Sequence, residues 1–243
     1  GGRRGAADPR AVGPAPVASP HPAPQSRWTR LLAAYWILLI AASLGLLLVF
    51  SKFASEVVEG EVTGFDEGLR AWVLRHRSPD STRAFGVLTL FASLQASLLF
   101  AAAAGAWLWI RKRRLGAAIF AATPVLTTVL FVAVKQLVAR QRPPGATAIL
   151  SSFSFPSGHM TSPTGLWVTL MYLLWREQLI PWVPAILIGA GWPLLVGLSR
   201  VYLDVHWASD VGAGWILGVG LALASAAVYE RWRARRSVHS PVK

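Results

Sequence analysis

Cysteine is absent from the 243 residues of the sequence. Disulfide bonds, thiolate metal sites and a cysteine nucleophile are therefore excluded for this chain, and with them the cysteine-dependent phosphatases. The sequence also lacks the Asp-x-Asp pattern of an aspartate nucleophile and the His-Glu-x-x-His pattern of a zinc site. Any covalent catalysis in this chain therefore falls to its 5 histidines.

Charged residues are also scarce. They make up 14% of the sequence, whereas hydrophobic residues make up 54%, and the mean hydropathy of +0.47 is too high for a soluble globular protein. Six apolar stretches approach or reach the roughly 20 residues that a membrane-spanning helix needs. The sequence therefore predicts an all-α, polytopic membrane helical bundle of six transmembrane helices. The six predicted spans are 31–50, 87–110, 115–134, 157–175, 181–198 and 207–228.

Acidic residues are the rarer charge, with 11 against 24 basic residues and a net charge of +13. In a soluble protein this excess would suggest nucleic-acid binding. Here the basic residues gather before the first predicted span, at 111–114 between the second and third spans, and after the sixth. The positive-inside rule accounts for this pattern with both termini in the cytoplasm of a plasma-membrane protein, so we expect no nucleic-acid partner.

Composition divides the chain into three parts. Residues 1–26 hold 6 of the 16 prolines and no apolar period, which predicts a disordered cytoplasmic tail. Residues 27–230 form the predicted six-helix transmembrane domain. Residues 231–243 are predicted to be a basic cytoplasmic tail.

The segment 51–86 carries 6 of the 11 acidic residues. An acidic cluster can indicate a metal site, but no histidine accompanies this one at ligand spacing. We therefore favour a solvated short helix or loop that caps the outer face, and expect neither a metal nor a cofactor.

Three polar clusters interrupt the apolar second half of the chain: Lys135 with Arg142-Pro143, then 156–159, then Ser199-Arg200 with His206 and Asp210. With a cytoplasmic N-terminus and six spans, the outer segments are 51–86, 139–156 and 199–206. All three clusters then lie at the outer surface of the membrane. They can meet there in one outward-facing site.

The cations of this predicted site are Lys135, Arg142 and Arg200. Each one alone could extend to the lipid headgroups, as long basic side chains do near helix ends. Together, and each beside another polar motif, they favour binding of a phosphoryl group, whose transfer depends on positioning and charge stabilisation.

The histidines of the site come from the other two clusters. Ser157 is suited to cap a helix, and with Gly158 and the first-turn amides it predicts an anion cradle beside His159. His206 and Asp210 are four residues apart and share a helix face, so the carboxylate can orient the imidazole. The alternatives are an ordinary capped helix start and a structural His-Asp pair.

The spacings Lys-x6-Arg-Pro, Pro-Ser-Gly-His and Ser-Arg-x5-His-x3-Asp resemble the three-part signature of the type-2 phosphatidic acid phosphatase superfamily, a fold shared by membrane lipid phosphatases and vanadium haloperoxidases. The resemblance implies that His206 attacks phosphorus, that Asp210 orients it and that His159 protonates the leaving group. It further implies that Lys135, Arg142, Ser157, Gly158 and Arg200 bind the phosphate. Asp204 departs from the small or neutral residue of many relatives, and we expect it to weaken phosphate binding or to pair with Arg200.

These observations predict a metal-independent phosphatase of the bacterial plasma membrane. Its expected substrates are lipid phosphate monoesters or diphosphates of the undecaprenyl diphosphate, phosphatidylglycerophosphate or phosphatidic acid type. A lipid phosphotransferase remains an alternative, because an alcohol can attack a phosphohistidine as water does. A non-catalytic membrane protein that binds anionic lipids is the other.

Overall fold

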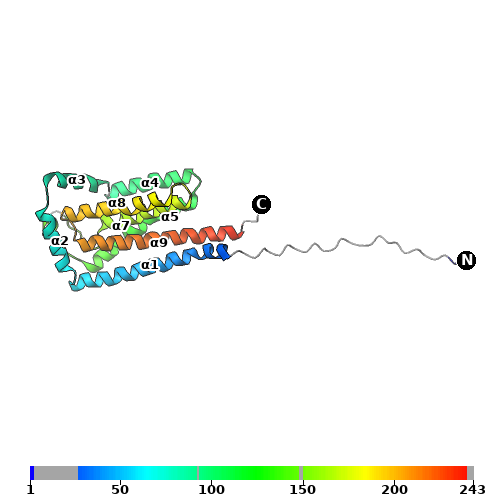
Figure 1. Cartoon of the computed structure of the whole chain (residues 1–243), viewed down its shortest axis with the longest axis horizontal. Helices are drawn as coiled ribbons and strands as arrows, with labels where there is room; N and C mark the ends of the chain where they lie inside the picture. The colour runs from blue at the N-terminus through cyan, green and yellow to red at the C-terminus, as the bar shows by residue number, and fades with distance from the viewer. Residues whose placement is uncertain (3–26, 92, 148–149, 240–243) are drawn as a thin grey trace.

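The computed structural model describes residues 1–2, 27–91, 93–147 and 150–239, which form a helical bundle without a strand in the described part (Figure 1). The predicted tail of residues 1–26 lies, except for its first two residues, outside the described residues. The helices are α1 (Arg27–Glu59), α2 (Thr63–Arg75), α3 (Pro79–Leu90), α4 (Leu94–Ile110), α5 (Arg114–Val138), α6 (Pro144–Thr147), α7 (Gly158–Arg176), α8 (Trp182–Tyr202) and α9 (Ala208–His239).

The chain is a multi-pass membrane protein, but the predicted count of six spans is not confirmed. Among the described residues, α1, α5, α8 and α9 are each long and apolar enough to cross a membrane. A fifth span results if α3 and α4, which meet at a bend of 45°, are counted as one. The helix that matches the fourth predicted span, α7, does not pass the same test.

The polarity of α7 follows from its place inside the bundle. It packs against α4, α5, α8 and α9, so its side chains face other helices more than lipid. Its buried polar residues include Thr161, Ser162, Thr164 and Thr169. A helix covered in this way does not need the apolar surface that a lipid-facing helix needs, and hydropathy alone is therefore a poor guide to it.

Glycines bring α7 and α9 into close contact. A Cβ atom on Gly218 would lie 2.6 Å from the Cβ of Thr164, and one on Gly214 would lie 2.8 Å from the carbonyl oxygen of Ser157. Small residues are used in membrane bundles where two backbones approach each other. This contact fixes the first turn of α7 beside the first turns of α9.

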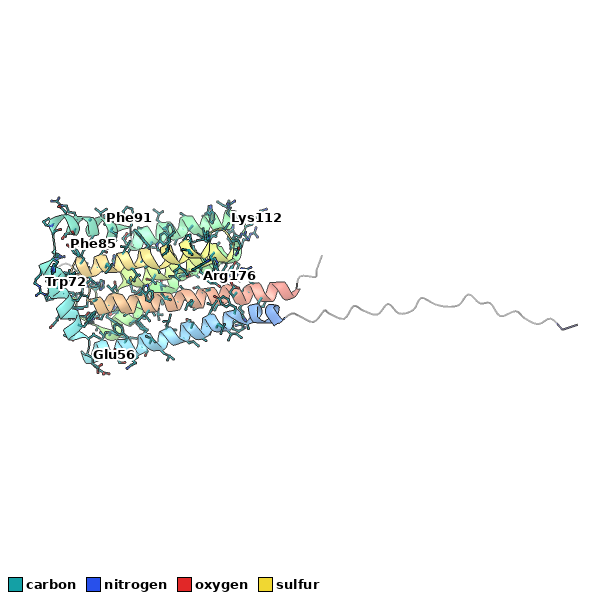
Figure 2. All side chains as sticks on the ribbon, in the orientation of Figure 1. Glu56, Trp72, Phe85, Phe91, Lys112 and Arg176 are labelled. Carbon is teal, nitrogen blue, oxygen red and sulfur yellow. The ribbon has the colours of Figure 1, made fainter. Side chains whose placement is uncertain are left out.

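The two ends of the bundle differ. Glu56 and Trp72 lie at one end, where α2 crosses the bundle, and Lys112 and Arg176 lie at the other (Figure 2). α1 starts and α9 finishes at the same side of the bundle as Lys112 and Arg176 (Figures 1 and 2). The segment 51–86, predicted as a cap, comprises the last turns of α1, then α2 and most of α3. The predicted basic tail begins inside α9, which continues to His239.

Candidate active site

The first polar cluster lies where α5 ends. Ala139 adopts a left-handed conformation with φ of 50°, and its amide donates to the carbonyl of Lys135 at 3.0 Å. This turn stops the helix and redirects the chain. Lys135 therefore stays in the last turn of α5, while Arg142 follows in the connecting segment on the same end of the bundle.

The second cluster begins α7. Ser157 occupies the N-cap position, as predicted, but its side chain makes no capping hydrogen bond. Its backbone amide instead donates to the carbonyl of Asp210 at 3.0 Å, which joins the starts of α7 and α9. Gly158 is close to Phe131, since a Cβ atom there would lie 2.9 Å from the Phe131 ring.

The third cluster turns the corner from α8 to α9. Asp204 has φ of 59°, a left-handed conformation that Asp tolerates better than most residues, and the amide of Val205 donates to the carbonyl of Arg200 at 3.1 Å. The tight corner leaves His206 two residues before α9, and Asp210 in its first turn.

These three segments enclose a cavity of about 210 Å³. Six of the eight predicted site residues line it, and Asp210 lies behind His206, fully buried. Ser157, the remaining predicted residue, does not line it either. The lining residues are Ser97, Phe131, Lys135, Arg142, Leu150, Ser152, Gly158, His159, Ser162, Arg200 and His206.

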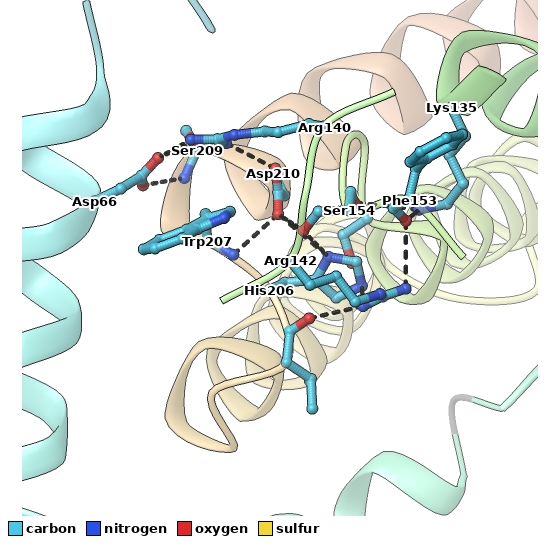
Figure 3. A network of polar contacts seen from close by, with 12 residues as sticks. Asp66, Lys135, Arg140, Arg142, Phe153, Ser154, His206, Trp207, Ser209 and Asp210 are labelled. Carbon is cyan, nitrogen blue, oxygen red and sulfur yellow. Dashed lines mark hydrogen bonds and ion pairs between the residues drawn. The ribbon is translucent and has the colours of Figure 1, made fainter. Parts of the chain in front are cut away.

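The His206 ring is held between an acceptor and a donor (Figure 3). Its Nδ1 lies 3.3 Å from Oδ2 of Asp210, and its Nε2 lies 3.2 Å from Nη1 of Arg142. A guanidinium nitrogen only donates, so Nε2 accepts and the ring proton belongs on Nδ1. This tautomer presents the lone pair of Nε2 on the side of the ring away from Asp210.

Backbone carbonyls fix two of the three predicted cations. Lys135 donates from Nζ to the carbonyls of Phe153 at 2.6 Å and Ser154 at 3.1 Å. Arg142 donates from Nε to the carbonyl of Ser152 at 2.7 Å and from Nη1 to the carbonyl of Val205 at 2.7 Å. Because these partners carry no formal charge, both side chains keep their positive charge available to an anion in the cavity.

Arg200 has one buried hydrogen-bond donor without a partner among the described residues. Its Nη1 donates to Oγ1 of Thr89 at 2.9 Å, whereas its buried Nε has no hydrogen-bond partner among the described residues. A buried donor without a partner is costly, and a phosphate oxygen in the cavity would satisfy it.

Burial shapes the electrostatics of the site. Burial, together with smaller contributions from the charges of Arg142 and Lys135, lowers the pKa of His206 to about 4 against the opposing effect of Asp210. It also lowers the pKa of Arg142, against the raising effect of Asp210. His206 is therefore neutral near neutral pH, which is the form in which its ring can act as a nucleophile.

Several residues that the sequence analysis did not single out complete the network. Ser154 donates its hydroxyl to Oδ2 of Asp210, which also accepts from the amide of Trp207 at 2.9 Å. Arg140 donates from Nη1 to Oδ1 of Asp210 at 2.8 Å and from Nη2 to Oδ2 of Asp66 at 2.7 Å. Its position two residues before Arg142 was the only sequence signal that Arg140 contacts the site.

Two acidic residues differ from the expectations for them. Asp204 does not pair with Arg200 but with Arg70 of α2, through contacts of 2.7 Å to Nε and 2.9 Å to Nη2. Asp66, in the acidic segment expected to be solvated, is only 2% exposed. Within the described residues, no group of three or more His, Asp or Glu is arranged to hold a metal ion.

Known proteins share the second half of this chain and its fold. Residues 115–234, which contain all three polar clusters, match the PAP2 superfamily. Phosphatidylglycerophosphatase B of Bacillus subtilis (strain 168) is 36% identical over 83 residues, which are 32% of this chain and 40% of that protein. The match thus spans less than half of that relative.

A solved structure extends the likeness to the whole bundle. It is described as the first transmembrane PAP2 type phosphatidylglycerolphosphate phosphatase from Bacillus subtilis. It superposes with a TM-score of 0.69 at 24% identity, over 83% of this chain and 98% of that chain. At this identity the likeness shows a shared fold.

Proposed function

Because the chain belongs to the PAP2 superfamily, we propose that it is a membrane phosphatase that hydrolyses lipid phosphate monoesters or diphosphates through a phosphohistidine. The observation that carries the proposal is the cavity of about 210 Å³, which two histidines and three cations line together. A non-catalytic anion site would need the cations but not a histidine oriented by a buried carboxylate.

The proposed reaction begins with attack by Nε2 of His206 on phosphorus. In the free protein this atom accepts a hydrogen bond from Arg142 at 3.2 Å, so an entering phosphoryl group takes over that guanidinium while it meets the nitrogen. Lys135, Arg142 and Arg200 stabilise the charge on the phosphoryl oxygens. Asp210 stabilises the imidazolium that forms when the Nε2–P bond is made.

His159 is the proposed general acid. It lines the same cavity as His206, and a negatively charged phosphoryl group beside it favours its protonated form. As the P–O bond breaks, His159 gives its proton to the leaving oxygen. It then takes a proton from the water that cleaves the P–N bond, which releases phosphate and restores His206. Ser157 and Gly158 contribute the backbone amides of the first turn of α7 to phosphate binding.

The surroundings of the cavity support a lipid substrate. Ser97 of α4 lines both the cavity and an apolar groove of about 430 Å³ between α4, α7 and α8. The groove lies along the side of the bundle, and its lining includes Ala103, Pro163 and Trp167. A substrate can therefore keep a hydrocarbon tail against the bundle while its phosphate reaches His206. We place this end of the bundle at the outer face of the plasma membrane, with the basic end in the cytoplasm.

The name of the Bacillus subtilis relative makes phosphatidylglycerophosphate the first substrate to test. Purified protein in detergent is assayed for phosphate release from phosphatidylglycerophosphate, phosphatidic acid, undecaprenyl diphosphate and glucose 6-phosphate. We expect kcat/KM for at least one lipid to exceed that for the sugar phosphate by about 10² or more, or roughly 2.7 kcal/mol of transition-state binding. Equal efficiency on the sugar phosphate would contradict the lipid assignment, and no turnover of any substrate would contradict the phosphatase.

A further inference from the structure

The helix α2 places one buried carboxylate in contact with the candidate site (Figure 3). Asp66 accepts from the amide of Ser209 at 2.9 Å and from the hydroxyl of the same residue. Its Oδ2 also accepts from Nη2 of Arg140 at 2.7 Å. Asp66 lies outside residues 115–234, so this contact comes from a part of the chain that the family match does not include.

Arg140 lies between two buried carboxylates. One arm of its guanidinium contacts Asp66, and the other contacts Oδ1 of Asp210 at 2.8 Å. The hydroxyl of Ser209 accepts from the second arm at 2.6 Å, and the guanidinium lies 5.6 Å from the centre of the Trp207 ring. A planar guanidinium held at both arms and stacked on an indole cannot rotate freely, so its orientation is set from α2.

Arg140 helps to fix how Asp210 uses its two oxygens, together with Ser154 and Trp207, which both donate to Oδ2. Oδ1 is occupied by Arg140, which leaves Oδ2 to face Nδ1 of His206 at 3.3 Å. If Asp66 were removed, Arg140 would keep a single carboxylate partner and would be free to engage both oxygens of Asp210. The carboxylate would then shift away from His206, which weakens the acceptor for the Nδ1 proton and leaves the donor contact of Arg142 with Nε2 to favour this tautomer alone.

We propose that Asp66 and Arg140 are positioning residues that act through Asp210 to hold His206 in the tautomer with an unprotonated Nε2. The catalytic part of this proposal rests on the proposed function, since Nε2 of His206 is the proposed nucleophile. Asp66 thereby makes α2 a necessary part of the site, although α2 lines no part of the cavity.

A purely structural role predicts a different pattern. On that view Asp66 only holds α2 against the bundle, and the loss of any ion pair that holds α2 there would lower activity equally. The pair of Arg70 with Asp204 supplies the comparison, because it also joins α2 to the α8–α9 corner, at 2.7 Å, without contacting Arg140 or Asp210. Arg70→Gln is therefore the matched control for Asp66→Asn.

The kinetic test compares Asp66→Asn, Arg140→Gln, the double variant and Arg70→Gln, with Arg140→Lys as a milder change if Arg140→Gln does not fold. We expect Asp66→Asn to lower kcat about tenfold or more with KM within about twofold, because phosphate binding is untouched. Arg70→Gln should stay within about twofold of the unaltered protein.

The double variant should match Arg140→Gln, since Asp66 acts through Arg140. Equal losses in Asp66→Asn and Arg70→Gln, or additive losses in the double variant, would overturn the proposal.

A second measurement does not depend on turnover. Nitrogen NMR of protein labelled with ¹⁵N-histidine distinguishes protonated from unprotonated ring nitrogens, and the spectrum of His206→Ala identifies the signals of His206. We expect the Nδ1–H form at neutral pH in the unaltered protein and in Arg70→Gln, and a measurably smaller share of it in Asp66→Asn, where only the Arg142 contact still favours it fully. The same tautomer in all three proteins would refute the positioning role even if the protein proved not to be a phosphatase. Absence of turnover with the expected tautomer changes would refute only the proposed function.

Discussion

Arg142 and His206 lie 3.2 Å apart from Nη1 to Nε2, and the guanidinium can only donate in this contact. The contact therefore does two things. It assigns the ring proton of His206 to Nδ1, toward Asp210, and it places a fixed positive charge beside the atom proposed to attack phosphorus. That charge favours the neutral ring, because it opposes a second positive charge close by.

The first prediction concerns pH. Burial, with smaller contributions from the charges of Arg142 and Lys135, lowers the pKa of His206 to about 4. The neutral ring, and with it the proposed attack, should be fully present above this value and lost as the pH falls through about 4, well below the ordinary histidine value near 6.5. The measurement is kcat/KM against pH, corrected for ionisation of the substrate phosphate.

The charge of Arg142 supplies a check on that assignment. Arg142→Gln removes a positive charge beside His206, so it should move the acid limb to higher pH while lowering kcat/KM overall. An acid limb near 6.5 in the unaltered protein would contradict the assignment of the buried His206 as the titrating group.

The second prediction separates the two histidines. His206→Ala should abolish turnover, because no other described side chain in the cavity is oriented by a carboxylate. His159→Ala should lose about 10² to 10⁴-fold in kcat, the usual scale for proton transfer to a leaving group. This loss should shrink for a substrate such as p-nitrophenyl phosphate, whose leaving oxygen needs little protonation. Near-normal activity of a folded His206→Ala protein would show that another group attacks.

The polar clusters were accessible to sequence analysis because each is compact and lies where a predicted span ends. Six of the eight predicted residues line the cavity, and Asp210 supports His206 from behind. The contacts of Asp66 were not accessible, since it meets Ser209 across 143 positions of the chain and no local pattern encodes such a pairing. The pairing of Arg70 with Asp204 was missed for the same reason, across 134 positions.

The predicted count of six spans is not confirmed for a different physical reason, which concerns α7. Hydropathy measures how favourable it is to place a segment in contact with lipid. The helix α7 has little lipid contact because it packs against four other helices. Its threonines and serine are buried against those helices, so the helix is too polar for a hydropathy test although it runs through the bundle. His159 lies in the first turn of this helix.

The third prediction concerns metal removal and inhibition. The proposed site stabilises phosphate with Lys135, Arg142 and Arg200, so activity should survive EDTA. Vanadate should inhibit, because it adopts the five-coordinate geometry of phosphorus during transfer and would meet the same three cations. Phosphate release is measured after dialysis against EDTA and again with added Mg²⁺. Activity that disappears on chelation and returns with the metal would contradict the proposed mechanism.

The fourth prediction is topological. The chain has no cysteine, so single cysteines report their own accessibility. Gly64→Cys in α2 is suitable because a Cβ atom there meets nothing within 4 Å, whereas one at Gly145 would lie 2.9 Å from Oδ2 of Asp204. Leu179→Cys marks the opposite end, between α7 and α8, where the residue is 37% exposed. An impermeant thiol reagent added to intact cells should label Gly64→Cys and spare Leu179→Cys. The reverse pattern would place the site in the cytoplasm.

The last prediction concerns the hydrocarbon tail of the substrate. The groove of about 430 Å³ shares Ser97 with the cavity, and Ala103 of α4 lines it. Ala103→Phe should fill part of the groove and lower kcat/KM for phosphatidic acid by about tenfold, or ~1.4 kcal/mol. It should leave kcat/KM for p-nitrophenyl phosphate, which has no tail, within about twofold of the unaltered protein.

The matched control is Ala102→Phe, since Ala102 lines a separate groove between α4 and α5 together with Gly105 and Ala118. A lipid-specific loss in Ala102→Phe but not in Ala103→Phe would move the tail to that second groove, and losses on both substrates in Ala103→Phe would mean that the added ring disturbs the cavity instead of the tail.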